Sequence, residues 1–224
     1  MTDRAILGEL PAWNLTDLYP ATDSPELASD LDAASADADA FAAAHEGKVG
    51  DLDGAALGAA IAEFERQEER LGRLSSYAQL VHAGDLSDPE IARFSQNVRE
   101  RVTAVSTKLL FFELELRRIE DDDLEAKLED PDLARYRPWL RDMRAFRPYQ
   151  LLDEVEKLLH EKTVAGRSAW MRLFDETLAD LRFPFRGREL TETEILHLLS
   201  DKDDAKRKEA AQSFGRVLGD NIRP

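Results

Sequence analysis

A run of apolar residues from Ile91 to Ile119 places the strongest constraint on how this chain can fold. Its members recur in steps of three and four, which keeps them on one face of an α-helix. A helix of about 30 residues is roughly 45 Å long, so a short partner cannot cover its apolar face. The run therefore predicts one long helix that needs an equally long partner. The stripe consists of Ile91, Phe94, Val98, Val102, Val105, Leu109, Phe112, Leu116 and Ile119.

The preceding segment, residues 57–81, offers such a partner within the same chain. It carries a similar stripe and ends at Gly84, only a few residues before the next helix. Short connections place neighbouring helices antiparallel. We therefore expect an intramolecular pair of long helices, with a dimerising coiled coil as the alternative. The apolar positions of this partner are Leu57, Ile61, Phe64, Leu71, Leu74 and Val81.

The composition favours helix along most of the chain. Alanine, leucine, glutamate and arginine are abundant and β-branched residues are sparse. The exception is residues 181–190, where apolar and basic residues alternate around Pro184 and Gly187, a pattern typical of a short hairpin. The predicted fold is mainly α, with antiparallel helical hairpins or a bundle, one long helix pair, and a short β-hairpin near 181–190.

The N-terminal arm and the overall charge narrow the possible roles. Pro11 and Pro20 bracket four large apolar residues, which predicts a strap pinned to the core, with a peptide-contacting arm as the alternative. The net charge of −16 disfavours nucleic-acid binding. We interpret this charge as that of a well-solvated surface. An electrostatic field that attracts cationic peptides is the alternative. The four residues of the arm are Trp13, Leu15, Leu18 and Tyr19.

The 224 residues contain no cysteine, which excludes thiol catalysis and disulfides and favours a reducing compartment. The sequence has neither a signal-peptide pattern nor an apolar run long enough to span a bilayer. We therefore expect a cytoplasmic protein that acts away from membranes.

Two charged clusters invite functional interpretation. Asp121, Asp122 and Asp123 are adjacent, whereas calcium loops space their ligands, so we expect them to begin a helix rather than bind a metal. Residues 133–147 carry five arginines interleaved with aromatic residues. In so acidic a chain we expect these arginines to pair with its own carboxylates, and recognition of a peptide carboxylate is the alternative.

The stretch 146–176 holds two further apolar stripes separated by Gly166. A glycine at a change of pattern is typical of a helix end. We therefore expect a helical hairpin, with Trp170 buried against the face from Leu151 to Leu159. Such burial would make Trp170→Ala cost about 3–5 kcal/mol of stability.

Three stretches of the sequence carry short patterns in a fixed order. They are Trp13-Asn14-Leu15-Thr16-Asp17-Leu18-Tyr19; then Phe146-Arg147-x-Tyr149, Leu151, Glu154, Glu156-x-Leu158-Leu159, Gly166 and Ala169-Trp170-x-x-Leu173-Phe174-Asp175; and finally Arg207-x-x-Ala210-Ala211. In this order they resemble the N-terminal portion of oligoendopeptidase F, a zinc metallopeptidase of the thimet-oligopeptidase-like M3 family. The resemblance implies residues 1–200 as the N-terminal helical domain and 201–224 as the first helix of the catalytic domain.

The resemblance also implies a zinc-dependent enzyme that hydrolyses short peptides, with its H-E-x-x-H motif beyond Pro224. That motif places two histidines one helical turn apart on a zinc ion. Here His45 and His160 are each followed by glutamate, but Val49 and Val164 stand where the second histidine is needed. We therefore expect this chain to contain no catalytic residue and no metal ligand, and to be inactive alone. It would form a wall of the substrate channel, and a stand-alone helical scaffold is the alternative. The pattern identifies neither the substrate-binding residues nor the oligomeric state.

Overall fold

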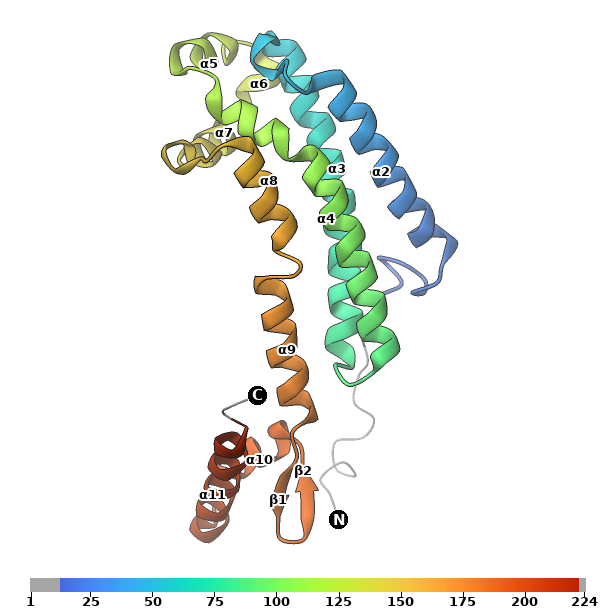
Figure 1. Cartoon of the computed structure of the whole chain (residues 1–224), viewed down its shortest axis with the longest axis vertical. Coiled ribbons are helices and arrows are strands. Elements are labelled where there is room, and N and C mark those ends of the chain that lie inside the picture. Colours follow the sequence, from blue (N-terminus) through green and yellow to red (C-terminus); the bar gives the residue numbers. More distant parts are fainter. Residues whose placement is uncertain (1–12, 222–224) are drawn as a thin grey trace. The chain divides into compact units, whose positions relative to one another are not determined.

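The computed structural model describes residues 13–221, which are mainly helical (Figure 1). The mainly α fold with a short β-hairpin is therefore confirmed. In chain order the elements are α2 (Pro25–His45), η1 (Val49–Asp51), α3 (Gly54–Gly84), α4 (Pro89–Arg118), α5 (Asp121–Lys127), α6 (Pro131–Ala134), α7 (Arg137–Arg144), η2 (Arg147–Tyr149), α8 (Asp153–Lys162), α9 (Arg167–Asp180), β1 (Phe183–Phe185), β2 (Arg188–Leu190), α10 (Glu192–Leu198) and α11 (Asp204–Asp220).

The chain divides into two compact units. The first comprises residues 1–84 and 93–164, and the second comprises 85–92 and 165–224. This division describes compactness and does not test the expected domain boundary at residue 200, which stays a prediction. None of the helices within residues 13–221 combines the length and the hydrophobicity needed to cross a bilayer.

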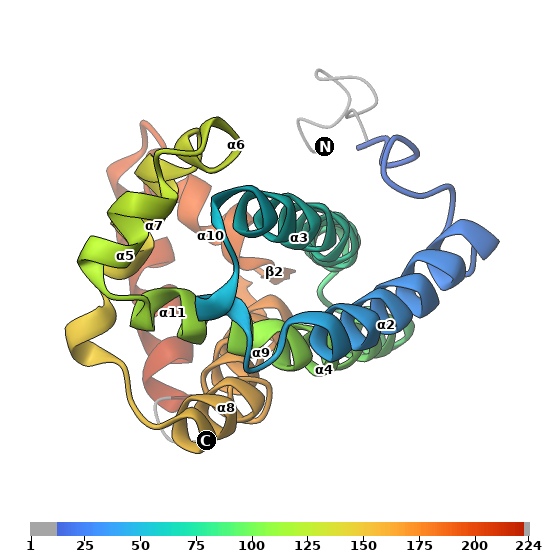
Figure 2. The same cartoon turned by 90° about the horizontal axis from the view of Figure 1, so that it is seen from above.

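The first unit is built around α2, α3 and α4, which lie side by side in both views (Figures 1 and 2). Phe112 of α4 is fully buried, and its ring centroid lies 5.0 Å from that of Phe41 in α2 and 5.1 Å from that of Phe64 in α3. The stripe on α4 is therefore covered within the chain, as we expected from the prediction of an intramolecular pair of long helices. Its buried members are Val98, Val105, Leu109, Phe112, Leu116 and Ile119.

The first turns of α3 pack unusually close to the segment that contains α5 and α6. A Cβ atom on Gly58 would lie 2.9 Å from the carbonyl carbon of Asp132, and one on Gly54 would lie 2.4 Å from the carbonyl oxygen of Lys127. Separations this short occur only when the residue has no side chain. The two glycines therefore permit a backbone approach that the apolar pattern alone did not reveal.

The N-terminal strap is confirmed for the residues that the structure describes. Tyr19 is buried, donates a hydrogen bond of 2.7 Å to Asp30, and packs edge-on against Tyr77. Leu15 and Leu18 are partly buried in the same cluster, whereas Trp13 is exposed. The earlier part of the predicted arm lies outside the described residues.

Local capping groups determine where several helices begin. The Ser24 hydroxyl accepts from the backbone N–H of Leu27 at the start of α2, as its position before Pro25 predicts. At the start of α4, Asp88 and not Ser87 accepts the free N–H groups, those of Glu90 and Ile91. The pattern Ser87-Asp88-Pro89-Glu90 predicts Ser87 as the cap of this helix, but that prediction is wrong, since the Ser87 hydroxyl donates to Asp85 instead.

The second unit contains the predicted hairpin, in which β1 and β2 are antiparallel. Arg186 and Gly187 connect the strands with φ values of 48° and 77°. Positive φ at both central residues is typical of a type I′ turn, which suits glycine. The buried ring of Phe183 stacks on Phe214 of α11, with centroids 5.3 Å apart, and Ile195 of α10 completes this small core.

The expected burial of Trp170 is wrong. Its side chain is 69% exposed, and none of the residues of α8 or α9, both fully described, is buried. The helices themselves form where predicted, and Gly166 is the N-cap of α9. Periodicity identifies the apolar face of a helix but carries no information about the element that covers it. For this reason the stripes were correctly recognised while the burial of Trp170 was not.

Candidate functional site

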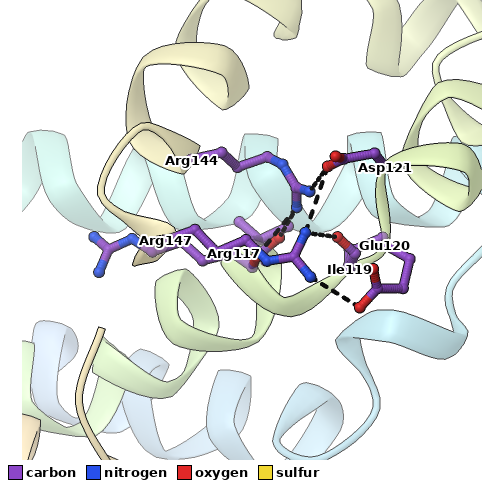
Figure 3. Close-up of polar contacts among 7 residues, drawn as sticks. Arg117, Ile119, Glu120, Asp121, Arg144 and Arg147 are labelled. Carbon is purple, nitrogen blue, oxygen red and sulfur yellow. Dashed lines mark hydrogen bonds and ion pairs between the residues drawn. The ribbon is translucent and has the colours of Figure 1, made fainter. Parts of the chain in front are cut away.

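Two arginines hold together the corner where α4 ends and α5 begins (Figure 3). Arg144 of α7 donates to the carbonyl oxygen of Leu116 at 2.9 Å and pairs with Asp121. Arg147 pairs with Glu120 at 2.8 Å and also lies near Asp121. The last carbonyls of a helix have no partner within the helix and carry partial negative charge, so guanidinium groups stabilise them. The corner is therefore a structural clamp.

The other arginines of this segment also find partners within the chain. Arg137 pairs with Glu125 at 2.6 Å, and Arg141 pairs with its neighbour Asp142. Arg135 donates to the Tyr136 hydroxyl, which in turn donates to Glu65. Burial raises the pKa of Tyr136, and the Glu65 carboxylate raises it further. Four of the five arginines therefore pair with carboxylates of the same chain, as predicted, whereas Arg135 is linked to Glu65 only through the Tyr136 hydroxyl.

The three adjacent aspartates occupy the first turn of α5, as predicted. Their carboxylates face the positive end of the helix dipole, which favours negative charge there. Asp121 is held by Arg144, and Asp123 pairs with Lys127 one turn later at 3.2 Å. The cluster therefore has local partners of opposite charge.

A cleft of about 320 Å³ lies between α5 and α7. Its floor is apolar, while its rim carries three arginines and two carboxylates. Arg137 and Arg144 already pair with Glu125 and Asp121, which belong to the same rim. The cleft therefore has little unbalanced positive charge with which to bind an anion. The lining residues are Asp121, Leu124, Glu125, Leu128, Arg137, Leu140, Arg141, Arg144 and Ala145.

The four histidines do not form a zinc site. They lie on four different helices: His45 on α2, His82 on α3, His160 on α8 and His197 on α10. Among residues 13–221, no three histidine, aspartate or glutamate side chains are grouped so that they could hold a metal ion. Since catalytic zinc takes three protein ligands, the donors in this part of the chain do not fit that ion.

The pair formed by Ser106 and His160 invites comparison with a nucleophile and its base. The Ser106 oxygen lies 2.8 Å from Nε2 of His160. The Ser106 oxygen also lies 3.1 Å from the carbonyl oxygen of Thr103, so the carbonyl and His160 compete for its single hydroxyl proton, and the tautomer of His160 decides which of them accepts it. The contact links α4 to α8.

Two further polar contacts attach α8 and its leading segment to α4. Arg118 forms an ion pair with Asp153, and the Gln150 side chain donates to the carbonyl oxygen of Leu114 at 3.2 Å. Together with Ser106 and His160, these groups place the polar side of α8 against α4. Sequence reasoning missed all three contacts, because isolated polar residues carry no periodic signal.

The apolar side of α8 remains exposed, and so does that of α9. Val155, Leu158 and Leu159 of α8 are 38%, 51% and 54% exposed. In α9, considered separately, Trp170 and Phe174 are 69% and 63% exposed. Large apolar groups gathered on one helix face mark an interaction surface more often than isolated ones do. Within residues 13–221, these two faces hold most of the exposed large apolar side chains of the helices.

Comparison with known proteins shows which class of proteins this helical region resembles. A family model described as oligopeptidase F matches residues 115–183. The chain is 28% identical over 157 residues to the group B oligopeptidase PepB of Streptococcus agalactiae, which covers 65% of this chain and 25% of PepB. Its fold is similar to the crystal structure of oligoendopeptidase-F from Enterococcus faecium, with a TM-score of 0.70 and 21% identity.

The chain is therefore similar to the N-terminal helical part of oligopeptidases. More particularly, it resembles the N-terminal portion of M3-family oligoendopeptidase F, as the sequence motifs indicated. The structural match covers 87% of this chain but 37% of the Enterococcus protein. The chain thus spans about a quarter of PepB and little more than a third of the matched structure.

Proposed function

We propose that this chain is the N-terminal region of a zinc-dependent oligoendopeptidase that hydrolyses short peptides. The observation that carries the proposal is the extent of the structural match, which covers 87% of this chain and 37% of an oligoendopeptidase-F. The proposal assigns residues 1–200 to an N-terminal helical domain and 201–224 to the start of the catalytic domain. The zinc ligands then belong to residues that follow Pro224.

In this proposal the region carries no catalytic residues and forms one wall of the substrate channel. A wall must keep its shape if it is to exclude folded proteins and admit short peptides. The continuous aromatic core of Phe41, Phe64 and Phe112 supports such rigidity, because close-packed interiors resist deformation. The region thus limits the size of the substrates that can enter the channel, while the catalytic residues lie elsewhere in the polypeptide.

The alternative, a stand-alone helical scaffold, depended on a free seam along α4. The central members of that seam, Val105, Leu109 and Phe112, are buried against α2 and α3. A coiled-coil partner would therefore have to displace the core of this chain. This observation favours the peptidase proposal over a coiled-coil scaffold.

The test compares the 224-residue chain with the complete polypeptide encoded by the natural gene. A quenched fluorogenic peptide reports hydrolysis, and mass spectrometry of the purified protein reports its zinc content. We expect the complete polypeptide to hydrolyse the peptide and to lose this activity with a chelator. The 224-residue chain should show neither hydrolysis nor stoichiometric zinc.

A longer, folded protein substrate is the matched control for the size filter. The complete polypeptide should cleave the short peptide and leave the folded substrate intact. Hydrolysis by the 224-residue chain after treatment with chelator and resupply of zinc would overturn the proposal. A natural gene that ends at Pro224 would favour the scaffold.

A further inference from the structure

The orientation of α8 on the first unit is the reverse of that expected for a surface helix. Asp153 and His160 face α4 and bind Arg118 and Ser106. The apolar residues on the other side of α8 face away from the core and remain exposed. A surface helix normally turns its apolar stripe toward the core. Because α8 is fixed through its polar side, its apolar side is available to another surface.

The exposed apolar residues are concentrated in the region that this chain shares with oligopeptidases. Fourteen large hydrophobic side chains are exposed within residues 13–221, and twelve of them lie in the matched segment 115–183. Only Trp13 and Leu196 lie outside it. Exposed large apolar side chains are therefore concentrated, in each unit separately, in the segment that the oligopeptidase F model matches.

The occupant of the apolar face of α8 is indicated by the length of the related proteins. The matched oligoendopeptidase-F has 63% of its chain outside the match, and PepB has 75% of its length outside. A large part of such a polypeptide must pack against the N-terminal portion if the two parts are to enclose a channel. An apolar helix face of about 15 Å suits the packing of another helix.

We infer that the face of α8 formed by Leu152, Val155, Leu158 and Leu159 docks against the part of the same polypeptide that follows residue 224. This inference rests on the proposed function, since it requires that such a part exists. It goes further by assigning the contact to one face of one helix. A second copy of this chain is the competing occupant, and the experiment distinguishes the two.

The absence of cysteine from the 224 residues allows the inference to be tested by site-specific labelling. Leu158→Cys places a thiol on the apolar face, and Val155→Cys provides a second position. Glu161→Cys is the matched control, because Glu161 is also exposed on α8 but does not belong to the apolar face. The reaction of each thiol with DTNB is measured in the 224-residue chain and in the complete polypeptide. Any natural cysteine beyond residue 224 is replaced by serine in every variant.

Burial of a thiol slows its modification, so in the complete polypeptide we expect Leu158→Cys and Val155→Cys to react about tenfold more slowly than in the 224-residue chain. The Glu161→Cys rate should change by less than about twofold. Equal rates at Leu158→Cys in the two proteins would overturn the inference. If the 224-residue chain is labelled slowly and its labelling rate rises on dilution, a second copy of the chain covers the face. That result would overturn the inference.

Peptide hydrolysis by the same variants separates this inference from the proposed function. Unprotected thiols in a polypeptide that hydrolyses peptides would refute the docking face and leave the proposed function intact. Protected thiols in a polypeptide without metal-dependent hydrolysis would refute the function and leave the docking face intact. A gene that ends at Pro224 would refute both.

Discussion

The helices α4 and α8 carry the same kind of apolar stripe, but only one of the stripes is buried. Phe112 in α4 is fully buried, whereas Leu158 in α8 is 51% exposed. Both stripes predict a helix equally well, and both helices form. The comparison shows that periodicity determines local structure and the direction of an apolar face. Whether that face is covered depends on elements that the local pattern does not contain.

The two helices are consequently held in place by different forces. Burial of a large apolar side chain such as Phe112 stabilises the fold by roughly 1.5–3 kcal/mol. The attachment of α8 includes the ion pair of Arg118 with Asp153, in which each side chain is about half exposed. Ion pairs of that kind contribute about 0–1 kcal/mol. We therefore expect substitutions in α4 to affect stability far more than substitutions in α8.

The largest expected effect is that of Phe112→Ala. Removal of this ring leaves a cavity among Phe41, Phe64 and Phe111, so the free energy of unfolding should fall by about 3–5 kcal/mol. Urea denaturation followed by circular dichroism at 222 nm measures the change. Leu158→Ala is the control and should change stability by less than about 0.5 kcal/mol. Equal losses from the two substitutions would mean that the contrast between α4 and α8 is wrong.

The features that the sequence predicted correctly are local or depend on uninterrupted patterns. The α4 stripe has a regular period and a matching neighbour, so both the helix and its burial could be expected. The cap at Ser24 and the turn at Gly187 follow from side chains within a few residues. The placement of Asp121 at the start of α5 has the same local basis.

The features that could not be predicted depend on three-dimensional proximity. Gly58 appears in the sequence as a weak point in a helix, whereas the structure places it against the backbone of Asp132. His160 appears as half of an incomplete zinc motif, whereas it binds Ser106, 54 positions away. From the sequence, the segment 146–176 stands out only through its resemblance to the family motifs. The contacts that attach α8 to α4 could be recognised only from the structure.

Two glycines of α3, Gly58 on a covered surface and Gly72 on an open one, allow covered and uncovered helix surfaces to be compared within one helix. Gly58→Ala introduces a methyl group against the Asp132 backbone and should destabilise the chain by about 1–3 kcal/mol. Gly72→Ala, in the same helix, meets no atom within 4 Å and should stabilise it by up to about 1 kcal/mol through helix propensity. Thermal unfolding of the two variants under identical conditions measures the difference. Destabilisation by both would show that Gly72 also faces a covered surface.

The smallest expected effect is that of Trp170→Ala, which tests the exposed face of α9 by itself. Because the indole is 69% exposed, its removal should change the stability of the 224-residue chain by less than about 0.5 kcal/mol, in contrast with the 3–5 kcal/mol expected for a buried ring. Urea denaturation by circular dichroism is the appropriate measurement, since the substitution itself removes a fluorophore. Phe183→Ala is the control in the same unit, because Phe183 is fully buried and its loss should be costly. A large loss from Trp170→Ala would mean that α9 is covered within this chain, and the distinction between buried and exposed stripes would then fail for the second unit.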